Sequence, residues 1–353
     1  MPSYRTRRVV EILEERLGLQ RVGLDDDSRA YALTSLVGSV EVGDEVVVNT
    51  TAVDLGLGTG GWHVVHWNLG HRDLDLPGPG HIMKVRYTSL QVDTGAAEEL
   101  PGLSSAPEVG AALPDLGGTP VLVGSLHSQV GVAAVVAKAL RPELRISYVM
   151  TDGAALPLAI SDLVHDLVGR GLLDGTVTAG HAFGGDLEAV SVPSALHLAV
   201  ERQRADLVIC AMGPGVVGTA SPLGTTAVEV ASIAVAAGAL GARAVVMCRA
   251  SSGDERERHR GISHHTWTAL SLAPLPVDVA LPPELAFESG RLGAHRVHVV
   301  EPPEVGPLLR AADLRVTTMG RGPQDDPLFF RAVASAAAHA VAMSGRSDTV
   351  GSP

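Results

Sequence analysis

The sequence predicts an α/β protein in which a Rossmann-like three-layer domain with a parallel sheet follows a small β-rich N-terminal domain. Two observations lead to this class. From about residue 119 onward, continuous apolar runs alternate with helical segments, which is typical of a parallel sheet covered on both faces. Before about residue 105, short β-like runs are instead separated by turn residues.

The N-terminal domain is expected to span residues 1–105 and to be a small barrel or sandwich. It should open with a short helix, because apolar residues recur at helical spacing at Val9, Ile12, Leu13 and Leu17. The β-like runs that follow lie at 30–53, 62–69 and 81–92. Within the first of them, the Gly43-Asp44 pair indicates a β-hairpin.

A linker should follow at 106–118, since the chain from Thr94 to Pro120 is rich in Pro, Gly, Ser and acidic residues. The Rossmann-like domain is expected at 119–345, with right-handed crossovers between its strands. A last helix should run from about Asp326 to Met343, and 346–353 should form a flexible tail. The strands are expected at 120–124, 145–150, 176–180, 206–212, 243–248, 277–281, 295–300 and 315–320.

The charge and the cysteine content exclude several classes of protein. A net charge of −12 argues against nucleic acid or an anionic membrane as a partner, because both require a basic face. The only two cysteines, Cys210 and Cys248, lie far apart and indicate a reducing compartment. The N-terminal segment carries acidic residues and is no signal peptide, so a cytoplasmic location is expected. Neither lysine, Lys84 or Lys138, lies in a P-loop motif.

The segments that follow the expected strands are rich in polar residues and glycine, whereas the segments that lead into the strands show no such enrichment. Ligands of open parallel sheets bind beyond the carboxyl ends of the strands, so these residues should line one crevice. The expected crevice residues are His127, Asp152, His181, Arg249, Asp254, His259, His264, His265 and Arg321.

The densest part of this set lies between Arg249 and Thr266 and allows three kinds of chemistry. His259, His264 and His265 are candidate ligands of a divalent metal, although adjacent histidines rarely both reach one ion, so at most one of the doublet is expected to do so. Alternatively, His264 is a general acid or base oriented by Asp254, with His259 and His127 as further catalytic candidates. In the third case Arg249, Arg258 and Arg260 hold a carboxylate or phosphate by forked hydrogen bonds.

A glycine-rich string, Gly213-Pro-Gly215-Val-Val-Gly218-Thr219, follows the strand expected at 206–212. It matches G-x-G-x-x-G but follows the fourth strand, and Arg249 stands where an acidic ribose ligand would be expected. Backbone amides that hold an anion are therefore favoured over dinucleotide binding.

Seven strings together resemble an uncharacterised bacterial family, domain-of-unknown-function family 3866. The chain departs from the family pattern at Ala220, where a glycine is usual, and at residues 251–253, where the family has an aromatic-containing stretch. The resemblance implies a bacterial, cytoplasmic protein and carries no established activity. The strings lie at 46–65, 80–91, 151–164, 178–190, 213–219, 258–270 and 318–330.

The residues themselves favour an enzyme that acts on a small anionic metabolite at this His/Arg-rich crevice. The alternative is a non-catalytic sensor that binds a nucleotide or a similar anion there. A homodimer is also expected, because the segment Thr225–Leu240 is apolar on most faces and must be covered by neighbouring helices or by a second subunit.

Overall fold

Two separately packed units make up the chain in the computed structural model, which describes residues 1–100 and 112–344. The first unit is Met1–Ala96, and the second begins at Ala97. The tail expected at 346–353 and residues 106–111 of the expected linker lie outside the described residues. Among those that are described, no helix has the length and hydrophobicity that crossing a bilayer requires.

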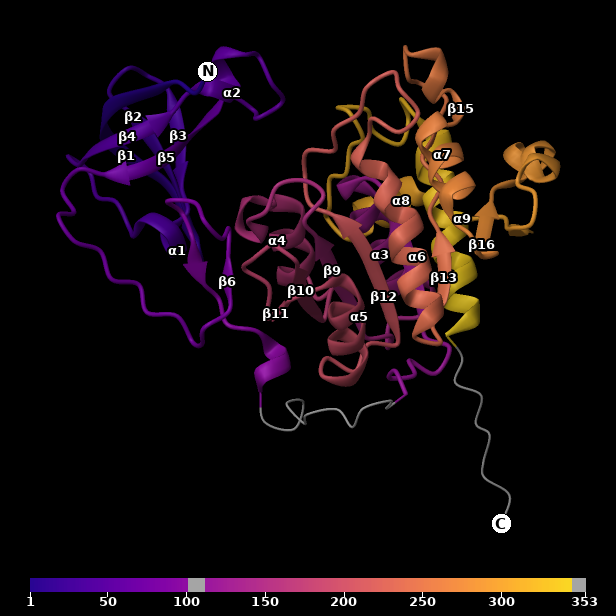
Figure 1. The fold of residues 1–353 in the computed structure, drawn as a ribbon. Helices are drawn as coiled ribbons and strands as arrows, with labels where there is room; N and C mark the ends of the chain where they lie inside the picture. Colours follow the sequence, from indigo (N-terminus) through magenta and orange to yellow (C-terminus); the bar gives the residue numbers. More distant parts are fainter. Residues whose placement is uncertain (101–111, 345–353) are drawn as a thin grey trace. The chain divides into compact units, whose positions relative to one another are not determined.

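The first unit is a closed β-barrel with the strand order β1-β2-β3-β5-β4 (Figure 1). Its core consists almost entirely of valine, leucine and alanine side chains. A small pair of strands, β6 (Met83–Lys84) and β7 (Val92–Asp93), lies outside the barrel sheet. The barrel elements are β1 (Tyr4–Arg16), β2 (Leu19–Leu24), β3 (Arg29–Ala32), α1 (Thr34–Val37), β4 (Glu45–Asn49), α2 (Thr51–Asp54) and β5 (Trp62–Asn68).

The expected N-terminal helix is wrong, because the segment forms strand β1. The register of β1 against β2 shifts between Val9 and Glu11 and again between Ile12 and Glu14. Each such irregularity adds a residue to the strand, so the inward-facing Val9 and Ile12 are three positions apart. The bulges thereby gave the buried residues the spacing expected of a helix. Leu17, which was expected to lie on the same apolar face, is fully exposed.

The hairpin expected at Gly43-Asp44 is also wrong, although the chain does turn there. No strand precedes the turn, because the backbone of Val40 pairs with the buried side chain of Gln20 and not with a neighbouring strand. The turn is held against β1: the amide of Gly43 donates to the carbonyl of Val9 at 2.8 Å, and the amide of Val9 donates to the carbonyl of Asp44 at 2.9 Å.

The second unit contains an eight-stranded sheet with the order β11-β10-β9-β12-β8-β13-β16-β17, and every pair in it is parallel. This confirms the Rossmann-like class. Strand β11, after β10, was not expected from the sequence. The strands are β8 (Pro120–Gly124), β9 (Ile146–Thr151), β10 (Gly175–Ala179), β11 (Leu187–Ala189), β12 (Leu207–Met212), β13 (Arg243–Val246), β16 (Asp278–Leu281) and β17 (Arg296–Val299).

The strand expected at 315–320 does not form. The segment has only an isolated bridge between Thr318 and Arg321, and Met319 and Gly320 have positive φ angles of 50° and 81°. Val316 and the preceding Leu314 pack into the core instead of extending the sheet. Apolar side chains that fill a core from a turn are indistinguishable in sequence from those of a short buried strand.

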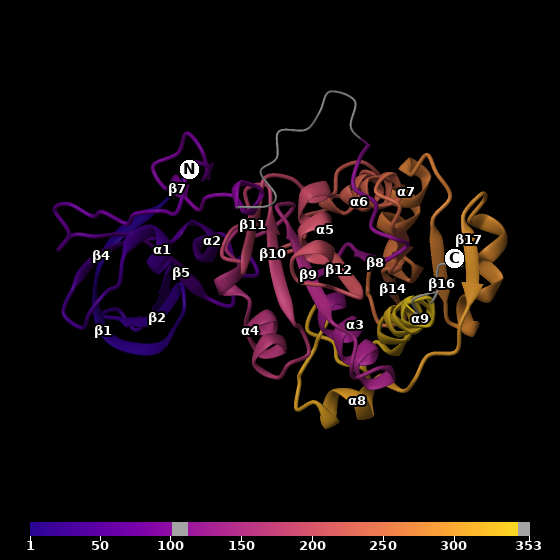
Figure 2. The same cartoon turned by 90° about the horizontal axis from the view of Figure 1, so that it is seen from below.

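Helices cover both faces of this sheet, as Figure 2 shows in a view along the layers. Helix α6 (Glu229–Ala239), the source of the dimer expectation, is covered by the sheet and by its neighbours α5 and α7. Its burial therefore does not require a second subunit, and a homodimer stays a prediction. One face carries α3 (His127–Leu140), α4 (Asp162–Gly169), α8 (Val305–Ala311) and α9 (Pro327–Met343), and the other carries α5 (Val192–Glu201), α6 and α7 (His264–Leu272).

A buried glutamine joins the ends of two central strands. Gln129, on the first turn of α3, accepts hydrogen bonds from the amides of Ser125 and Leu126 at 2.8 and 2.9 Å. Its amide nitrogen donates to the carbonyl of Met247 at 2.8 Å. One side chain thus satisfies three backbone groups in the loops after β8 and β13, which line the carboxyl edge of the sheet.

We predict that Gln129→Leu lowers the free energy of unfolding by about 2–4 kcal/mol, because it leaves these buried backbone groups without partners. Urea unfolding of the purified chain measures this change. The exposed Gln324 provides the control, and Gln324→Leu should change stability by less than about 0.5 kcal/mol. Equal effects of the two substitutions would contradict the structural role assigned to Gln129.

Candidate functional site

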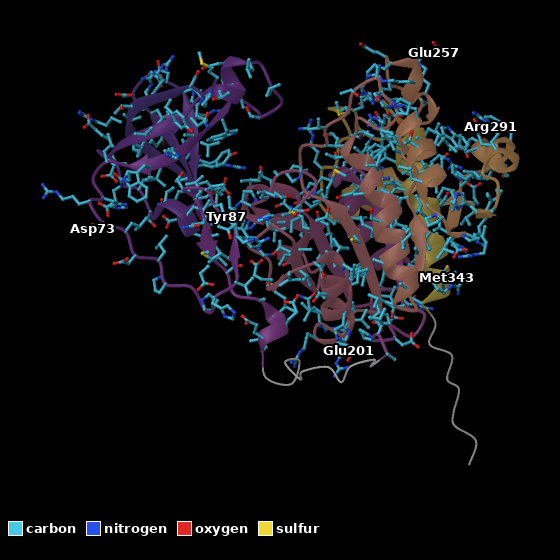
Figure 3. The ribbon with its side chains drawn as sticks, in the orientation of Figure 1. Asp73, Tyr87, Glu201, Glu257, Arg291 and Met343 are labelled. Atoms are coloured by element: carbon cyan, nitrogen blue, oxygen red, sulfur yellow. The ribbon has the colours of Figure 1, made fainter. Side chains whose placement is uncertain are left out.

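The segment from Arg249 to Thr266 folds back on itself at the carboxyl edge of the sheet. Strands β14 (Ala250–Ser251) and β15 (Gly261–Ile262) pair antiparallel, and the 3-10 turn η4 (Glu257–His259) lies between them. The amide of Ser263 donates to the carbonyl of Arg249 at 2.8 Å. In Figure 3, Glu257 on this segment and Glu201 at the end of α5 mark opposite ends of the second unit.

Three histidines meet where this segment enters α7. The ring centroids of His264 and His265 are 4.3 Å apart, and each lies 5.0 Å from the ring of His259. One nitrogen from each ring comes within 4.8 Å of the other two. Both members of the doublet therefore lie close to His259, whereas the sequence favoured only one of them as a ligand of the same ion.

Hydroxyl groups and an arginine orient two of these rings. Nδ1 of His259 lies 2.7 Å from Oγ of Ser263, the N-cap of α7. Nδ1 of His265 lies 3.4 Å from Oγ1 of Thr225 and 3.3 Å from Nη1 of Arg249. In contrast, Nε2 of His264 and Nε2 of His265 are buried and have no hydrogen-bond partner among the described residues.

The three imidazoles are neutral at neutral pH. Burial is the first cause, and neighbouring arginines are the next. Together they lower the pKa of His259 to about 3 and that of His265 to about 4. The pKa of His264 is lowered for the same reasons, with Arg258 as the largest charge contribution. The neutral imidazole is the form that binds a metal ion.

Asp254 is the centre of a buried ion-pair network that supports the histidines. Its carboxylate accepts hydrogen bonds from Nε and Nη2 of Arg256, both at 2.9 Å, and from Nη2 of Arg321 at 3.3 Å. Nη2 of Arg249 lies 3.8 Å away. These contacts, above all the hydrogen bond from Arg256, hold the pKa of Asp254 well below its usual range.

The hypothesis that Asp254 orients His264 is therefore wrong, since its carboxylate is engaged by arginines.

The second carboxylate of the network belongs to Asp326, which is fully buried and accepts from Nε of Arg321 at 3.0 Å and from the Ser252 amide at 2.8 Å. A buried carboxylate shared between several guanidinium groups fixes their positions more firmly than a single pair does.

One guanidinium near the histidines remains exposed. Arg258 makes no hydrogen bond or ion pair within residues 1–100 and 112–344. The neighbouring Arg260 is tied down, because its Nε donates to the carbonyl of Asp254 at 2.9 Å. Three arginines in the hydrogen-bonded network face two carboxylates, and Arg258, Arg249 and Arg256 are the positive charges that act on both His264 and His265.

The glycine-rich string 213–219 runs along the carboxyl edge between two groups of polar residues. At one end, the amide of Ala155 donates to the carbonyl of Pro214 at 2.9 Å, and a Cβ on Gly213 would lie 2.6 Å from the carbonyl oxygen of Ala155. At the other end, a Cβ on Gly218 would lie 2.5 Å from the ring of His265. Close packing thus explains both glycines without an anion.

The remaining residues of the string form the loop itself. Gly215 has a φ of 103°, a conformation that favours glycine, although a Cβ at this position would meet no atom within 4 Å. The hydroxyl of Thr219 donates to the carbonyl of Gly224 at 3.1 Å and accepts from the Ser221 amide at 3.1 Å. Thr219 therefore closes the loop, and helix α6 begins ten residues later, at Glu229, so the string does not lie at a helix N-terminus.

A second polar group lies after β9 and contains two predicted site residues. The carboxylate of Asp152 accepts from the His181 amide at 3.0 Å. Thr151, beside Asp152, donates from its hydroxyl to Oε1 of Glu229 at 2.8 Å. Burial and, to a smaller extent, the charge of Asp152 raise the pKa of Glu229 to about 7.

His127 belongs to neither group. Its Nε2 lies 2.6 Å from Oγ of Ser161, and its Nδ1 lies 3.3 Å from the hydroxyl of Tyr148. Burial lowers its pKa to about 4. Both ring nitrogens therefore have partners, and neither partner is one of the other candidate residues.

Sequence reasoning missed Thr225, Glu229, Arg256 and Asp326. Thr225 and Glu229 lie in or next to an apolar segment, where isolated polar residues carry no spacing signal. Asp326 could have been noticed, because it directly precedes a proline at the first position of a helix, where a carboxylate often interacts with free amides. Arg256 was one of several arginines in a charged loop, and only the fold selects it.

The fold and the site define an α/β protein with a barrel unit, a parallel-sheet unit and a His/Arg-rich cluster at the carboxyl edge of the sheet. The chain belongs to the family described as protein of unknown function (DUF3866), whose model matches residues 29–337. This match confirms the resemblance found in the sequence and includes every candidate site residue. Comparison with curated proteins and with solved structures gives no match.

We predict that Asp254→Asn destabilises the chain by about 2–4 kcal/mol, because it leaves the buried Arg249 and the partly buried Arg256 without a carboxylate. Thermal and urea unfolding measure the effect. The matched control is Asp166→Asn, which removes an exposed carboxylate 3.2 Å from Arg170 and should cost less than about 0.5 kcal/mol. If both variants are as stable as wild type, Asp254 does not hold the network together.

The raised pKa of Glu229 predicts a pH-dependent contribution to stability. Its folded pKa of about 7 exceeds the ordinary value of 4.5, so the folded state binds the extra proton and the contribution is complete below pH 4.5. It is lost as the pH rises to about 7. Relative to wild type, Glu229→Gln should therefore gain on the order of 1–3 kcal/mol across this interval.

Unfolding free energies of the two proteins, measured at several pH values, test this prediction. The control is Glu201→Gln, which changes an exposed carboxylate at the end of α5 and should leave the pH profile unchanged. Parallel profiles for wild type and Glu229→Gln would show that Glu229 titrates normally in the folded chain.

Proposed function

We propose that this protein is an enzyme that acts on a small anionic metabolite, bound at the carboxyl edge of the sheet beside the three histidines. One observation carries the proposal: two buried imidazole nitrogens have no partner among the described residues, and an exposed guanidinium, Arg258, acts on the same histidines. Buried polar atoms without partners are uncommon in proteins, and a bound ion, a bound water or a catalytic role is among the explanations for them.

Charge determines the class of substrate. The arginines of the network outnumber its carboxylates, and Arg258 extends this surplus to the surface. Guanidinium groups bind carboxylates and phosphates through paired hydrogen bonds, which fix both the position and the orientation of the anion. A neutral or cationic substrate would gain nothing from this arrangement.

The rigidity of the histidines supports catalysis over simple binding. Ser263 and Thr225 contact two of the rings, and Arg249 of the ion-pair network contacts the ring of His265. An anion held by Arg258 would present its reacting group to imidazoles that need no reorganisation, which is a general requirement of catalytic sites. A sensor needs affinity but does not need this placement.

The Asp152–Glu229 group contributes a means of moving a proton. A carboxyl group with a pKa of about 7 gives and takes protons at neutral pH, as a general acid or base must. The glycine-rich string extends from the loop of Asp152 to His265. We include Glu229 in the proposal as the candidate proton donor for the end of the substrate that lies away from Arg258.

Thermal-shift measurements against panels of phosphorylated and carboxylated metabolites test the proposal, followed by product analysis for each ligand found. We predict that Arg258→Ala and His264→Ala abolish the response and leave the melting temperature nearly unchanged, because Arg258 is exposed and the free nitrogen of His264 has no partner to lose. Arg258→Lys should retain only part of the response, since lysine lacks the paired hydrogen bonds.

The control is Arg310→Ala, which removes an exposed arginine on α8. It should respond to ligands as wild type does. Binding without turnover would favour the non-catalytic sensor. A large fall in melting temperature with ligand affinity intact would show that the histidine cluster is a structural element and that the site is elsewhere.

A further inference from the structure

We propose that His259, His264 and His265 bind one divalent metal ion of the zinc type through three imidazole nitrogens, with the fourth position open toward Arg258. This inference deepens the proposed function, since it concerns the same cluster. It rests on the geometry of the rings and on their free nitrogen atoms.

The three rings lie close enough together for one ion to bind to all of them. Nε2 of His264 and Nε2 of His265 are closed to solvent, so no water molecule satisfies them from outside. The three candidate ligand atoms are at most 4.8 Å from one another. Two nitrogens bound to a tetrahedral zinc ion are about 3.4 Å apart, since each Zn–N bond is about 2.0–2.1 Å. Small rotations of the rings close this difference.

The atoms behind the rings have the arrangement that metal-binding histidines require. A ligating imidazole usually donates its other N–H to an oxygen, which fixes the tautomer and the ring plane. Nδ1 of His259 faces Oγ of Ser263 at 2.7 Å, and Nδ1 of His265 faces Oγ1 of Thr225 at 3.4 Å. Both rings can therefore keep a proton on Nδ1 and offer Nε2 to an ion.

Arg249 must change its partner when the ion binds. A guanidinium can only donate, so its contact with Nδ1 of His265 at 3.3 Å requires that this nitrogen carry no proton. With the proton on Nδ1, His265 would donate to Thr225, and Arg249 would turn to the carboxylate of Asp254, 3.8 Å from it. Thr225 thus provides an acceptor for the N–H of His265, and Asp254 provides one for Arg249.

The surplus of positive charge determines what occupies the open position. A dication next to Arg249 and Arg258 is unfavourable by itself, so its fourth ligand should be an anion. The anionic group of the substrate is the obvious candidate, and this couples the metal to the substrate class inferred above. Zinc sites with three protein ligands and one exchangeable position are catalytic and not structural.

A second group of potential ligands provides a comparison within the same chain. Asp278, His298 and His339 also have ligand atoms within 4.8 Å of one another. There, however, both carboxylate oxygens of Asp278 accept from Arg296 at 3.0 Å, and Nε2 of His298 lies 2.8 Å from the same carboxylate. An ion would have to displace an arginine, so we expect this second group to bind none.

The experiment uses the full chain after dialysis against a chelator and without any substrate. Zinc binding is measured by competition with a chromophoric chelator, and cobalt binding by its visible absorption. We expect one ion per chain and a cobalt spectrum of four-coordinate type. His264→Ala and His265→Ala should each weaken zinc binding on the order of 100-fold. His298→Ala and the exposed His165→Ala are the controls and should bind as wild type does.

If a histidine variant fails to fold, X-ray absorption at the zinc edge of the wild-type chain provides the decision. Three imidazole ligands support the inference, whereas the second group could supply only two. Absence of binding at micromolar zinc, or binding that His298→Ala abolishes and His265→Ala leaves intact, would overturn it. A chain that binds no metal but still responds to anions through Arg258 would refute this inference and leave the proposed function standing.

Discussion

The candidate site depends on a buried carboxylate, that of Asp254, which lies among three guanidinium groups. Without it, Arg249, Arg256 and Arg321 would be partly buried cations with too little opposing charge, and the segment between Arg249 and Thr266 could not fold back over the sheet edge. Asp326, at the start of α9, forms a second ion pair with Arg321. The network uses strong, directional contacts to hold a loop that has few apolar residues of its own.

The same network explains why the histidines are neutral. Nearby arginines oppose protonation of the imidazoles, and burial removes the water that would otherwise stabilise the charged form. The hydroxyls of Ser263 and Thr225 engage one nitrogen of His259 and of His265, while Nε2 of His264 and of His265 stay unpaired. The protein therefore maintains unpaired imidazole nitrogens in a positively charged environment, an arrangement that stabilises neither the loop nor the core and is understandable as a binding site.

Regular alternation made most of the second unit predictable from sequence. The buried runs at 120–124 and 206–212 became strands β8 and β12 nearly residue for residue, because a strand buried on both faces needs continuous apolar side chains. The sequence prediction failed where an irregular backbone feature placed apolar residues at the spacing of a different type of secondary structure. Bulges in β1 spaced Val9 and Ile12 like a helix, and Leu314 and Val316 filled the core from a turn. In both cases the side chains are apolar because they are buried in the core, and a buried apolar side chain is compatible with a helix, a strand or a turn.

The sequence by itself determined the class of fold, the edge of the sheet that carries polar chemistry and the residue types available there. It did so because strand polarity places every loop that follows a strand at one edge. Only the tertiary structure decided which residues meet: Asp254 turns to arginines and not to His264, His127 is enclosed by Tyr148 and Ser161, and both His264 and His265 reach His259. Those outcomes depend on how loops far apart in the chain cross one another, and no local pattern encodes that crossing.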